Sequence, residues 1–307
     1  MNVIELIEAQ TARLTKAGVS FGHGTTNAFD EAAWLVLWAM KTPLDALEKH
    51  ATREVAADEL SAAEALVTRR IETRQPAAYL TKEAWLQNVP FYIDERSIVP
   101  RSYIAELLAD AEEEGTLDAW LTDETHTVLD LCTGNGSLAV IAAMAFPEVV
   151  VDAADISDDA LEIARINVAK HQLGNRITVL KSDLYASLPK AYDLIVCNPP
   201  YVNAVSMSKL PAEYLAEPQL ALAGGEDGMD LVRTILADSV RHLTPSGVLV
   251  LEIGNERRHF DKAFKRLEVA WLETSGGADK VALLTRESLE AYARRAAAFA
   301  ASDKPAA

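Results

Sequence analysis

The chain has 307 residues, half of them hydrophobic, and a formal net charge of −17. This length is typical of a folded protein with two domains, one of them small, and the negative charge argues against a general electrostatic grip on nucleic-acid phosphates. Because the chain shows neither a basic and apolar N-terminal signal nor an apolar run long enough to span a bilayer, we expect a soluble, cytoplasmic protein.

The N-terminal part of the chain, residues 1–80, is predicted to form a small helical bundle. Apolar side chains recur at helical spacing over 3–14, a second apolar stretch covers 32–39, and a third helix is expected over 56–73. The glycine-containing stretch 18–27 is predicted to be a loop. The bundle is expected either to be a scaffold or to dock a substrate, and the pattern does not separate the two.

A β-hairpin linker is predicted over residues 81–101. Gln75-Pro76 ends the helical pattern. Three short strand-like stretches follow, at 84–86, 91–93 and 98–101. Residues 102–114 are predicted to return to helix, at the start of a core domain that covers 102–307.

The core domain alternates strand and helix. Apolar runs predict strands at 127–131, 149–154, 177–181, 193–197 and 247–253. Helices are predicted at 137–145, 158–171, 228–243, 256–266 and 286–300. The alternation predicts a doubly wound α/β fold with a parallel sheet. Two further strands, at 269–272 and 281–284, are joined by so short a turn that they can pair only antiparallel.

The two cysteines, Cys132 and Cys197, each end a predicted strand. Two isolated cysteines indicate neither a disulfide framework nor a metal site, and the histidines show no ligand spacing. No metal is therefore expected. The thiols would approach one another only if the two strands are neighbours.

A glycine turn follows the first core strand. Gly134 and Gly136 allow a tight turn and the close approach of a ligand to the backbone. Asp155 lies one strand later, where a carboxylate can accept both ribose hydroxyls, and alone this pattern also fits NAD binding. Asp130 argues against NAD, because a carboxylate at that strand tip would lie near the pyrophosphate. It suits S-adenosylmethionine, whose methionine end carries an ammonium and a sulfonium.

The stretch 192–201 places a polar side chain at a strand tip. Residues 194–196 are apolar and β-prone, as in a central parallel strand. Pro199 and Pro200 cannot donate to a sheet ladder, so strand pairing must end there. The residue before a proline is extended, which presents Asn198 beyond the strand end, where α/β sheets bind their ligands.

These two regions resemble the class I S-adenosylmethionine-dependent methyltransferases. Residues 130–136 match their D/E-x-x-x-G-x-G motif. The resemblance implies a Rossmann-like, seven-stranded sheet with an antiparallel last strand, S-adenosylmethionine as cofactor and S-adenosylhomocysteine as product. The cofactor-binding residues that it implies are Asp130, Cys132, Thr133, Gly134, Gly136, Asp155, Ile156, Ser182, Asp183 and Asn198. Asp155 would bind the ribose and Asp183 would approach the adenine amino group, although a helix N-cap is an equal alternative for Asp183.

Asn198-Pro199-Pro200-Tyr201 is similar to the N-P-P-Y motif of methyltransferases that modify planar nitrogens: adenine N6, cytosine N4 or the glutamine amide. Positive charge builds on such an NH₂ during transfer, and the Asn198 side-chain oxygen and the Pro199 carbonyl can accept both of its N–H groups. Preorganised acceptors of this kind are worth about 3 kcal/mol each. Tyr201 can stack on the planar group. Asn198, Pro199 and Tyr201 are thus the candidate catalytic residues.

The resemblance extends to the bacterial protein-(glutamine-N5) methyltransferases over most of the chain. It is carried by the stretches at 75–81, 91–96, 99–102 and 224–232. This family has a release-factor branch and a branch acting on large-subunit ribosomal protein three. Cys132, Pro100-Arg101-Ser102 and the stretch 283–287 resemble the ribosomal-protein branch, whereas Tyr103 stands where that branch usually has proline.

The resemblance therefore implies methylation of one glutamine in a basic ribosomal protein, free or in an assembling ribosome, with no membrane and no direct nucleic-acid contact required. The substrate-binding residues that it implies are Asn198, Pro199, Pro200, Tyr201, Arg101 and Glu217. For Arg101 a surface ion pair is the alternative. The alternative functions are release-factor methylation, DNA adenine methylation, a non-catalytic S-adenosylmethionine-binding or ribosome-assembly module, and a dehydrogenase.

Overall fold

The computed structural model describes residues 1–110, 115–188 and 190–302 and divides into two compact units. Met1–Arg101 and Leu210–Pro218 form the first, which we call the helical unit. Ser102–Lys209 and Gln219–Ala307 form the second, which we call the sheet unit. The chain therefore passes from one unit to the other after Arg101, after Lys209 and after Pro218.

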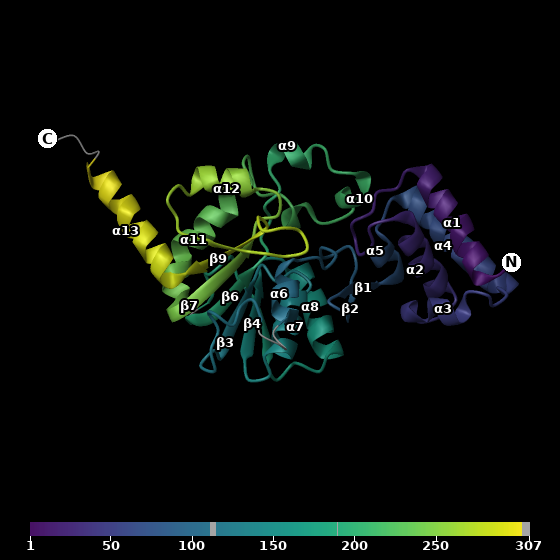
Figure 1. The fold of residues 1–307 in the computed structure, drawn as a ribbon, viewed down its shortest axis with the longest axis horizontal. Helices are drawn as coiled ribbons and strands as arrows, with labels where there is room; N and C mark the ends of the chain where they lie inside the picture. Colours follow the sequence, from purple (N-terminus) through teal and green to yellow (C-terminus); the bar gives the residue numbers. More distant parts are fainter. Residues whose placement is uncertain (111–114, 189, 303–307) are drawn as a thin grey trace. The chain divides into compact units, whose positions relative to one another are not determined.

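The helical unit is a bundle followed by a short hairpin (Figure 1). Its helices are α1 (Val3–Ala17), α2 (Ala28–Ala39), α3 (Leu47–His50), α4 (Ala57–Thr73), α5 (Ala77–Thr81) and α10 (Ala212–Leu215), with a 3₁₀ turn η1 (Leu44–Ala46). Asn2 begins α1 by accepting the Glu5 N–H, while the Glu5 carboxylate accepts the Asn2 N–H. This reciprocal capping satisfies backbone donors that a helix start otherwise leaves open. Strands β1 (Glu83–Leu86) and β2 (Val89–Tyr92) pair antiparallel.

The strand predicted at 98–101 is wrong, because this segment forms no strand. Pro100 has no N–H to donate to a ladder. The Val99 N–H instead donates to the Glu217 carboxylate at 3.0 Å. Of the helix predicted at 102–114, the structure has α6 (Ile104–Ala109), and residues 111–114 lie outside the described residues.

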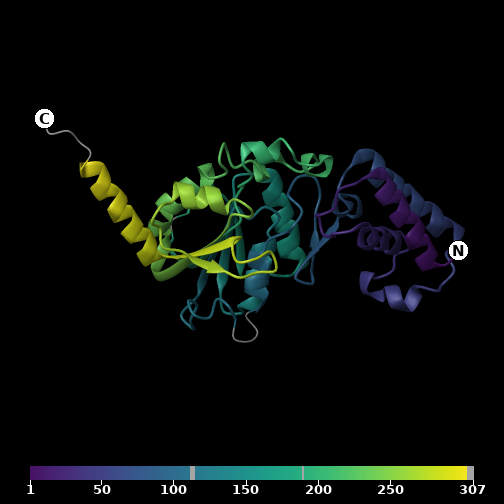
Figure 2. The ribbon, with the colours of Figure 1, turned by 45° about the horizontal axis from the view of Figure 1, so that its top comes forward.

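The sheet unit contains a seven-stranded sheet in the order β5-β4-β3-β6-β7-β9-β8. Its strands are β3 (Thr127–Leu131), β4 (Val150–Asp155), β5 (Ile177–Lys181), β6 (Tyr192–Cys197), β7 (Leu243–Glu252), β8 (Ala270–Leu272) and β9 (Val281–Thr285). β3 to β7 run parallel, and β9, the last strand along the chain, pairs antiparallel with both β7 and β8 at the edge coloured yellow in Figure 2. The predicted class I methyltransferase sheet is confirmed.

Helices pack on both faces of this sheet (Figure 1). They are α7 (Ser137–Ala145), α8 (Asp158–Lys170), α11 (Asp230–His242), α12 (Arg257–Ala263) and α13 (Arg286–Ser302). The sheet unit also contains the short helix α9 (Ala204–Met207), which buries no residue, and a 3₁₀ turn η3 (Gln219–Ala221). Leu129, Ile195 and Leu249 belong to one buried cluster with residues of α11, α12 and α13. The alternate side chain Asp130 points to α7, as period-two alternation requires. None of the helices in the described ranges is long and apolar enough to cross a membrane.

The topology brings three predicted site segments to one edge of the sheet. β3 lies between β4 and β6, and Leu131 pairs with Ala154 on one side and Cys197 on the other. The chain order reverses at β3, which is where doubly wound sheets open a crevice for ligands. The glycine turn, Asp155 and Asn198 therefore leave neighbouring strand ends.

Candidate functional site

The glycine turn between β3 and α7 is tied to the end of β4. Asp155 accepts the Gly134 N–H through Oδ2 and the Ser157 N–H through Oδ1, both at 2.9 Å. The Thr133 N–H donates to the Ala154 carbonyl, also at 2.9 Å. Gly136 has a φ of 80°, and a Cβ there would lie 3.1 Å from the Ala164 Cβ of α8. This glycine therefore allows both the left-handed turn and the close approach of α7 to α8.

The carboxylate of Asp130 is buried beneath this turn. Its Oδ2 accepts the Thr133 hydroxyl at 2.5 Å and the Ala139 N–H at 2.9 Å. Its Oδ1 is buried and has no hydrogen-bond partner among the described residues. Burial raises the pKa of Asp130 to about 7, against the lowering effect of the Thr133 and Ala139 hydrogen bonds. Asp130 Oδ1 can therefore accept a hydrogen bond from a ligand or a water.

The predicted adenine-side residues follow β4 and β5. Ser182 is buried, and its hydroxyl donates to the Leu184 carbonyl at 2.6 Å. Asp183 is exposed, and no helix of the described chain begins there, so the structure does not support the helix N-cap alternative. Ile156, next to Asp155, is 46% exposed although it is a large apolar side chain. An apolar surface beside the predicted ribose acid is thus open to a ligand.

The N-P-P-Y segment extends from the end of β6 and is held at its tyrosine. A Cβ at Gly224 would lie 2.7 Å from the Tyr201 backbone, and one at Gly228 would clash with the Tyr201 carbonyl oxygen. A Cβ at Gly254 would lie 2.5 Å from the Tyr201 ring. Two glycines of the loop before α11 and one that follows β7 therefore close around Tyr201, while Asn198 at the strand tip is half-buried. Any larger side chain at these positions would displace the tyrosine.

Glu252, at the end of β7, is a site residue that the sequence analysis missed. Its carboxylate is buried and accepts the Tyr201 hydroxyl through Oε1 at 3.3 Å. Its Oε2 accepts the Ser102 hydroxyl at 2.6 Å and the Tyr103 N–H at 2.9 Å. Burial raises the pKa of Glu252 despite these hydrogen bonds. The signal was present, because Glu252 ends an apolar run just as Asn198 follows one.

We expect Glu252→Ala to lower both stability and activity, because it removes the acceptor of the half-buried Ser102 hydroxyl and Tyr103 N–H and the Glu252 contact that holds the Tyr201 hydroxyl. A typical intramolecular hydrogen bond contributes about 0.5–1.5 kcal/mol to stability. Urea denaturation measures the loss, and Glu252→Gln, which keeps one acceptor oxygen, should recover part of it. Equal unfolding free energies for the alanine variant and the native protein would contradict this role.

Arg101 and Glu217, both predicted to bind substrate, lie in the helical unit and bind one another. The Arg101 guanidinium donates to Glu217 Oε1 at 2.7 Å and to Oε2 at 2.6 Å. His23, which the sequence analysis did not single out, lies with its Nε2 3.3 Å from Glu217 Oε2. Burial would raise the pKa of Glu217, but Arg101 and His23 bring it down to about 2. The ion-pair alternative for Arg101 is therefore observed, although its partner is buried rather than on the surface.

Cys132 and Cys197 are free thiols at the ends of the neighbouring strands β3 and β6. Burial raises the pKa of Cys197, and a hydrogen bond with Cys132 raises it further. Both thiols are therefore neighbours, and Cys197 stays protonated. Within the described ranges, no group of His, Cys, Asp or Glu side chains could hold a metal ion.

Comparison with known proteins gives close relatives over nearly the whole chain. The family model of the methyltransferase small domain matches residues 115–226. The chain is 52% identical to a ribosomal protein uL3 glutamine methyltransferase of Bordetella pertussis, over 93% of this chain and 95% of that protein. It is 49% identical to the protein of the same name from Burkholderia pseudomallei, over 95% of this chain and 96% of that one. The corresponding protein of Neisseria meningitidis serogroup B is 47% identical, over 93% of each chain.

Proposed function

Because the chain belongs to the family of the ribosomal protein uL3 glutamine methyltransferases, we propose that it transfers a methyl group from S-adenosylmethionine to the side-chain amide nitrogen of one glutamine in that ribosomal protein. The observation that carries this proposal is the position of the N-P-P-Y segment, which leaves β6 beside the glycine turn that ends β3. The identity to the uL3 enzymes over more than nine-tenths of the chain favours this substrate over release factors. The net charge of −17 suits a basic protein partner. The reaction would take place in the cytoplasm.

The residues of the N-P-P-Y segment would hold the substrate amide. The Asn198 side-chain oxygen and the Pro199 carbonyl accept the two N–H groups, and Tyr201 stacks on the amide plane. These acceptors stabilise the positive charge that develops on nitrogen, and they are preorganised because the strand end and the prolines fix them. Glu252 and the three glycines keep Tyr201 in place. The methylated nitrogen loses its proton after the transfer, so no residue is required as a general base.

The residues at the ends of β3 and β4 fit S-adenosylmethionine. The unpartnered Oδ1 of Asp130 would accept a hydrogen bond from the cofactor's ammonium, directly or through a water. Asp155 would accept the ribose hydroxyls, and the exposed Ile156 would cover one face of the adenine, with Ser182 and Asp183 at its edge. Gly134 and Gly136 keep side chains away from the turn. The cofactor supplies an electrophilic methyl group on a sulfonium.

We expect the affinity for S-adenosylmethionine to fall as the pH falls through about 7. The pKa of Asp130 is raised to about 7, so the group is largely ionised at higher pH and largely protonated at lower pH. Only the carboxylate attracts an ammonium, so the dissociation constant should rise up to about tenfold per pH unit below that pKa. Calorimetric titration from about pH 8.5 to about pH 6 measures this. Asp130→Asn should bind weakly with no such pH dependence, and an unchanged pH profile in that variant would contradict the assignment.

The proposed function is tested by incubating the protein with methyl-labelled S-adenosylmethionine and fractions of a bacterial lysate. The fractions are free uL3, assembling large subunits, release factors and DNA. Label on one glutamine of uL3, identified by peptide mass spectrometry, supports the proposal. The fraction that contains the label shows whether free uL3 or the assembling subunit is the substrate. Label only in release factors or only in DNA would overturn the substrate.

A further inference from the structure

The segment that follows N-P-P-Y leaves the sheet unit and returns to it. Residues 202–209 belong to the sheet unit, Leu210–Pro218 to the helical unit, and the chain re-enters the sheet unit at Gln219. Only ten residues separate Tyr201 from the middle of this excursion, Ala212–Leu215 of α10. Whatever fixes residues 210–218 therefore restricts the chain directly beyond the catalytic motif.

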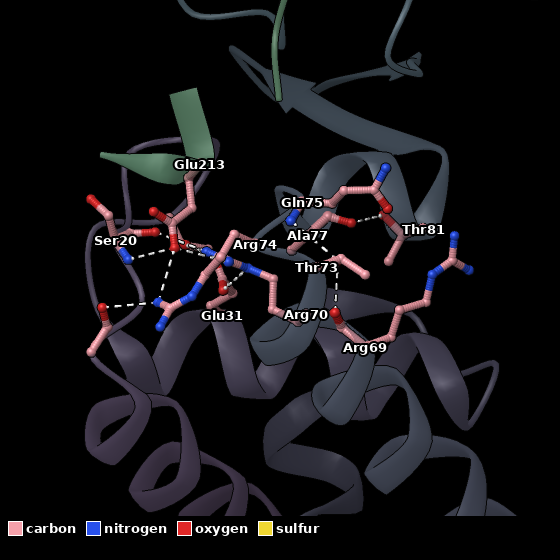
Figure 3. Close-up of polar contacts among 12 residues, drawn as sticks. Ser20, Glu31, Arg69, Arg70, Thr73, Arg74, Gln75, Ala77, Thr81 and Glu213 are labelled. Carbon is pink, nitrogen blue, oxygen red and sulfur yellow. Dashed lines mark hydrogen bonds and ion pairs between the residues drawn. The ribbon is translucent and has the colours of Figure 1, made fainter. Parts of the chain in front are cut away.

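Glu213 of α10 is fixed by a buried ion-pair network of the helical unit (Figure 3). Its Oε1 accepts the Ser20 N–H at 3.0 Å and the Arg70 guanidinium at 3.3 Å. Arg70 is also buried and donates to Glu31 Oε1 and to the Ser20 carbonyl, each at 2.8 Å. Burial would raise the pKa of Glu213, but the Ser20 and Arg70 hydrogen bonds bring it below its ordinary value. A carboxylate far along the chain thus completes a charge network within the bundle.

The same segment has a second attachment to the loop between α1 and α2. The Tyr214 ring lies 4.3 Å from the His23 ring, centre to centre, and the Arg101 guanidinium lies 5.3 Å from the Tyr214 ring. A Cβ at Gly22 would lie 2.8 Å from the Tyr214 hydroxyl oxygen, so this glycine admits the tyrosine. Glu217 adds its bidentate pair with Arg101. Residues 213, 214 and 217 are therefore all held by the helical unit.

The choice of charged side chains for this attachment indicates a role beyond stability. Apolar side chains of similar volume hold a buried contact as well as an ion pair does, or better, whereas ion pairs specify one arrangement in some proteins. Glu213 and Glu217 are the two acidic residues between positions 202 and 223, and both are buried. The segment instead exposes apolar side chains, namely Val205 (62%), Leu215 (58%) and Leu220 (60%). It therefore presents no exposed carboxylate in a strongly acidic chain.

We propose that the Arg70–Glu213 ion pair is a positioning device for protein substrate: it holds residues 210–218 in one conformation, so that the segment beyond N-P-P-Y is preorganised for the polypeptide that carries the target glutamine. This inference rests on the proposed function. Arg70 and Glu213 are buried within the helical unit and act through the segment. Without the pair, the segment loses conformational entropy when the substrate polypeptide binds. The affinity for protein substrate therefore falls, while cofactor binding is unchanged.

The test compares Glu213→Ala, Glu213→Gln and the native protein. In Glu213→Ala, Arg70 keeps Glu31 as its partner, so this variant preserves more of the network than a change at Arg70. Initial rates are measured with uL3 varied at saturating S-adenosylmethionine, and the cofactor dissociation constant is measured by calorimetry. We expect the KM for uL3 to rise about tenfold in Glu213→Ala with kcat within about threefold, the pattern of lost uniform binding. Glu213→Gln, which still accepts the Ser20 N–H, should restore part of the affinity.

Glu95→Ala is the matched control, because Glu95 pairs with Lys82 in the same unit but is exposed. It should leave the KM unchanged. A native KM for folded Glu213→Ala, even with a lower melting temperature, would overturn the inference and leave the proposed function intact. A parallel weakening of cofactor binding would overturn it as well. If the native protein does not label uL3, the proposed function fails and the inference fails with it.

Discussion

Asn198→Ala is expected to lower kcat for glutamine methylation about 10²–10³-fold, because it removes one preorganised acceptor from the charge that develops on the amide nitrogen. The acceptor lies at the end of β6, where the strand and Pro199 fix its backbone. Single-turnover rates with labelled cofactor and uL3 measure the loss. The variant should fold normally, because the side chain is half-buried at a strand end rather than part of the core.

Two further variants separate this effect from general damage. Asn198→Gln keeps the amide but moves its oxygen by one methylene, so it should also be slow, since catalysis requires the acceptor at one position. Asn175→Ala removes an exposed amide from the turn between α8 and β5 and should be fully active. A fast Asn198→Ala enzyme would remove Asn198 from the catalytic residues, whichever substrate is methylated.

The sheet could be predicted because its signals are local. The strands at 127–131 and 177–181 and the helix at 137–145 have the predicted bounds. Each is an apolar run that a polar residue, a glycine or a proline ends, so the neighbouring sequence alone carries the information. The same reasoning placed Asp130, Asp155 and Asn198 at strand ends, and the strand order then brought those ends side by side. The order of the strands along the chain does not give their order in the sheet, but a parallel α/β sheet allows few strand orders.

The failures have a different physical origin. The segment 98–101 has strand-like residues, yet the Val99 N–H finds its partner 118 positions away in Glu217. Glu213 and Arg70 are likewise 143 positions apart. Such partners satisfy buried polar groups through tertiary contacts, which no local pattern encodes. For this reason the sequence analysis assigned Arg101 and Glu217 to substrate binding without seeing that they bind one another.

Glu252 is an intermediate case. Its position after the apolar residues 248–251 is a local signal of the kind that identified Asn198. Its contacts with Tyr201, Ser102 and Tyr103 are long-range and could not be predicted. The sequence therefore reveals which strand ends carry polar groups, and the structure is needed to learn which of these groups support the motif and which are free for a ligand.

Arg70→Met is expected to lower the free energy of unfolding by about 3–5 kcal/mol, because it removes the cation that pairs with the buried Glu31 carboxylate, whereas Glu213 keeps Arg74. Arg70 bonds both Glu31 and Glu213, and all three side chains are buried. Methionine replaces the aliphatic part of the arginine side chain but has neither charge nor donors. Chemical denaturation monitored by circular dichroism measures the change. Arg53→Met is the matched control, because Arg53 pairs with Glu59 nearer the surface, where an ion pair contributes about 0–1 kcal/mol.

The loss of unfolding free energy in Arg70→Met should depend on pH, and the pKa shifts in the native network determine in which direction. Burial already raises the pKa of Glu31 against the effect of Arg70, so its ionised form costs stability as the pH rises. The pKa of Glu213 is lowered, so its native contribution is present above its unfolded pKa and is lost as the pH falls through the folded one. Without Arg70 the main lowering effect on Glu31 is lost, so burial raises the pKa of Glu31 further and its protonation at low pH relieves the penalty. The difference in unfolding free energy between the variant and the native protein should therefore be larger at about pH 8 than at about pH 5. A pH-independent difference would show that lost packing, not uncompensated charge, destabilises the variant.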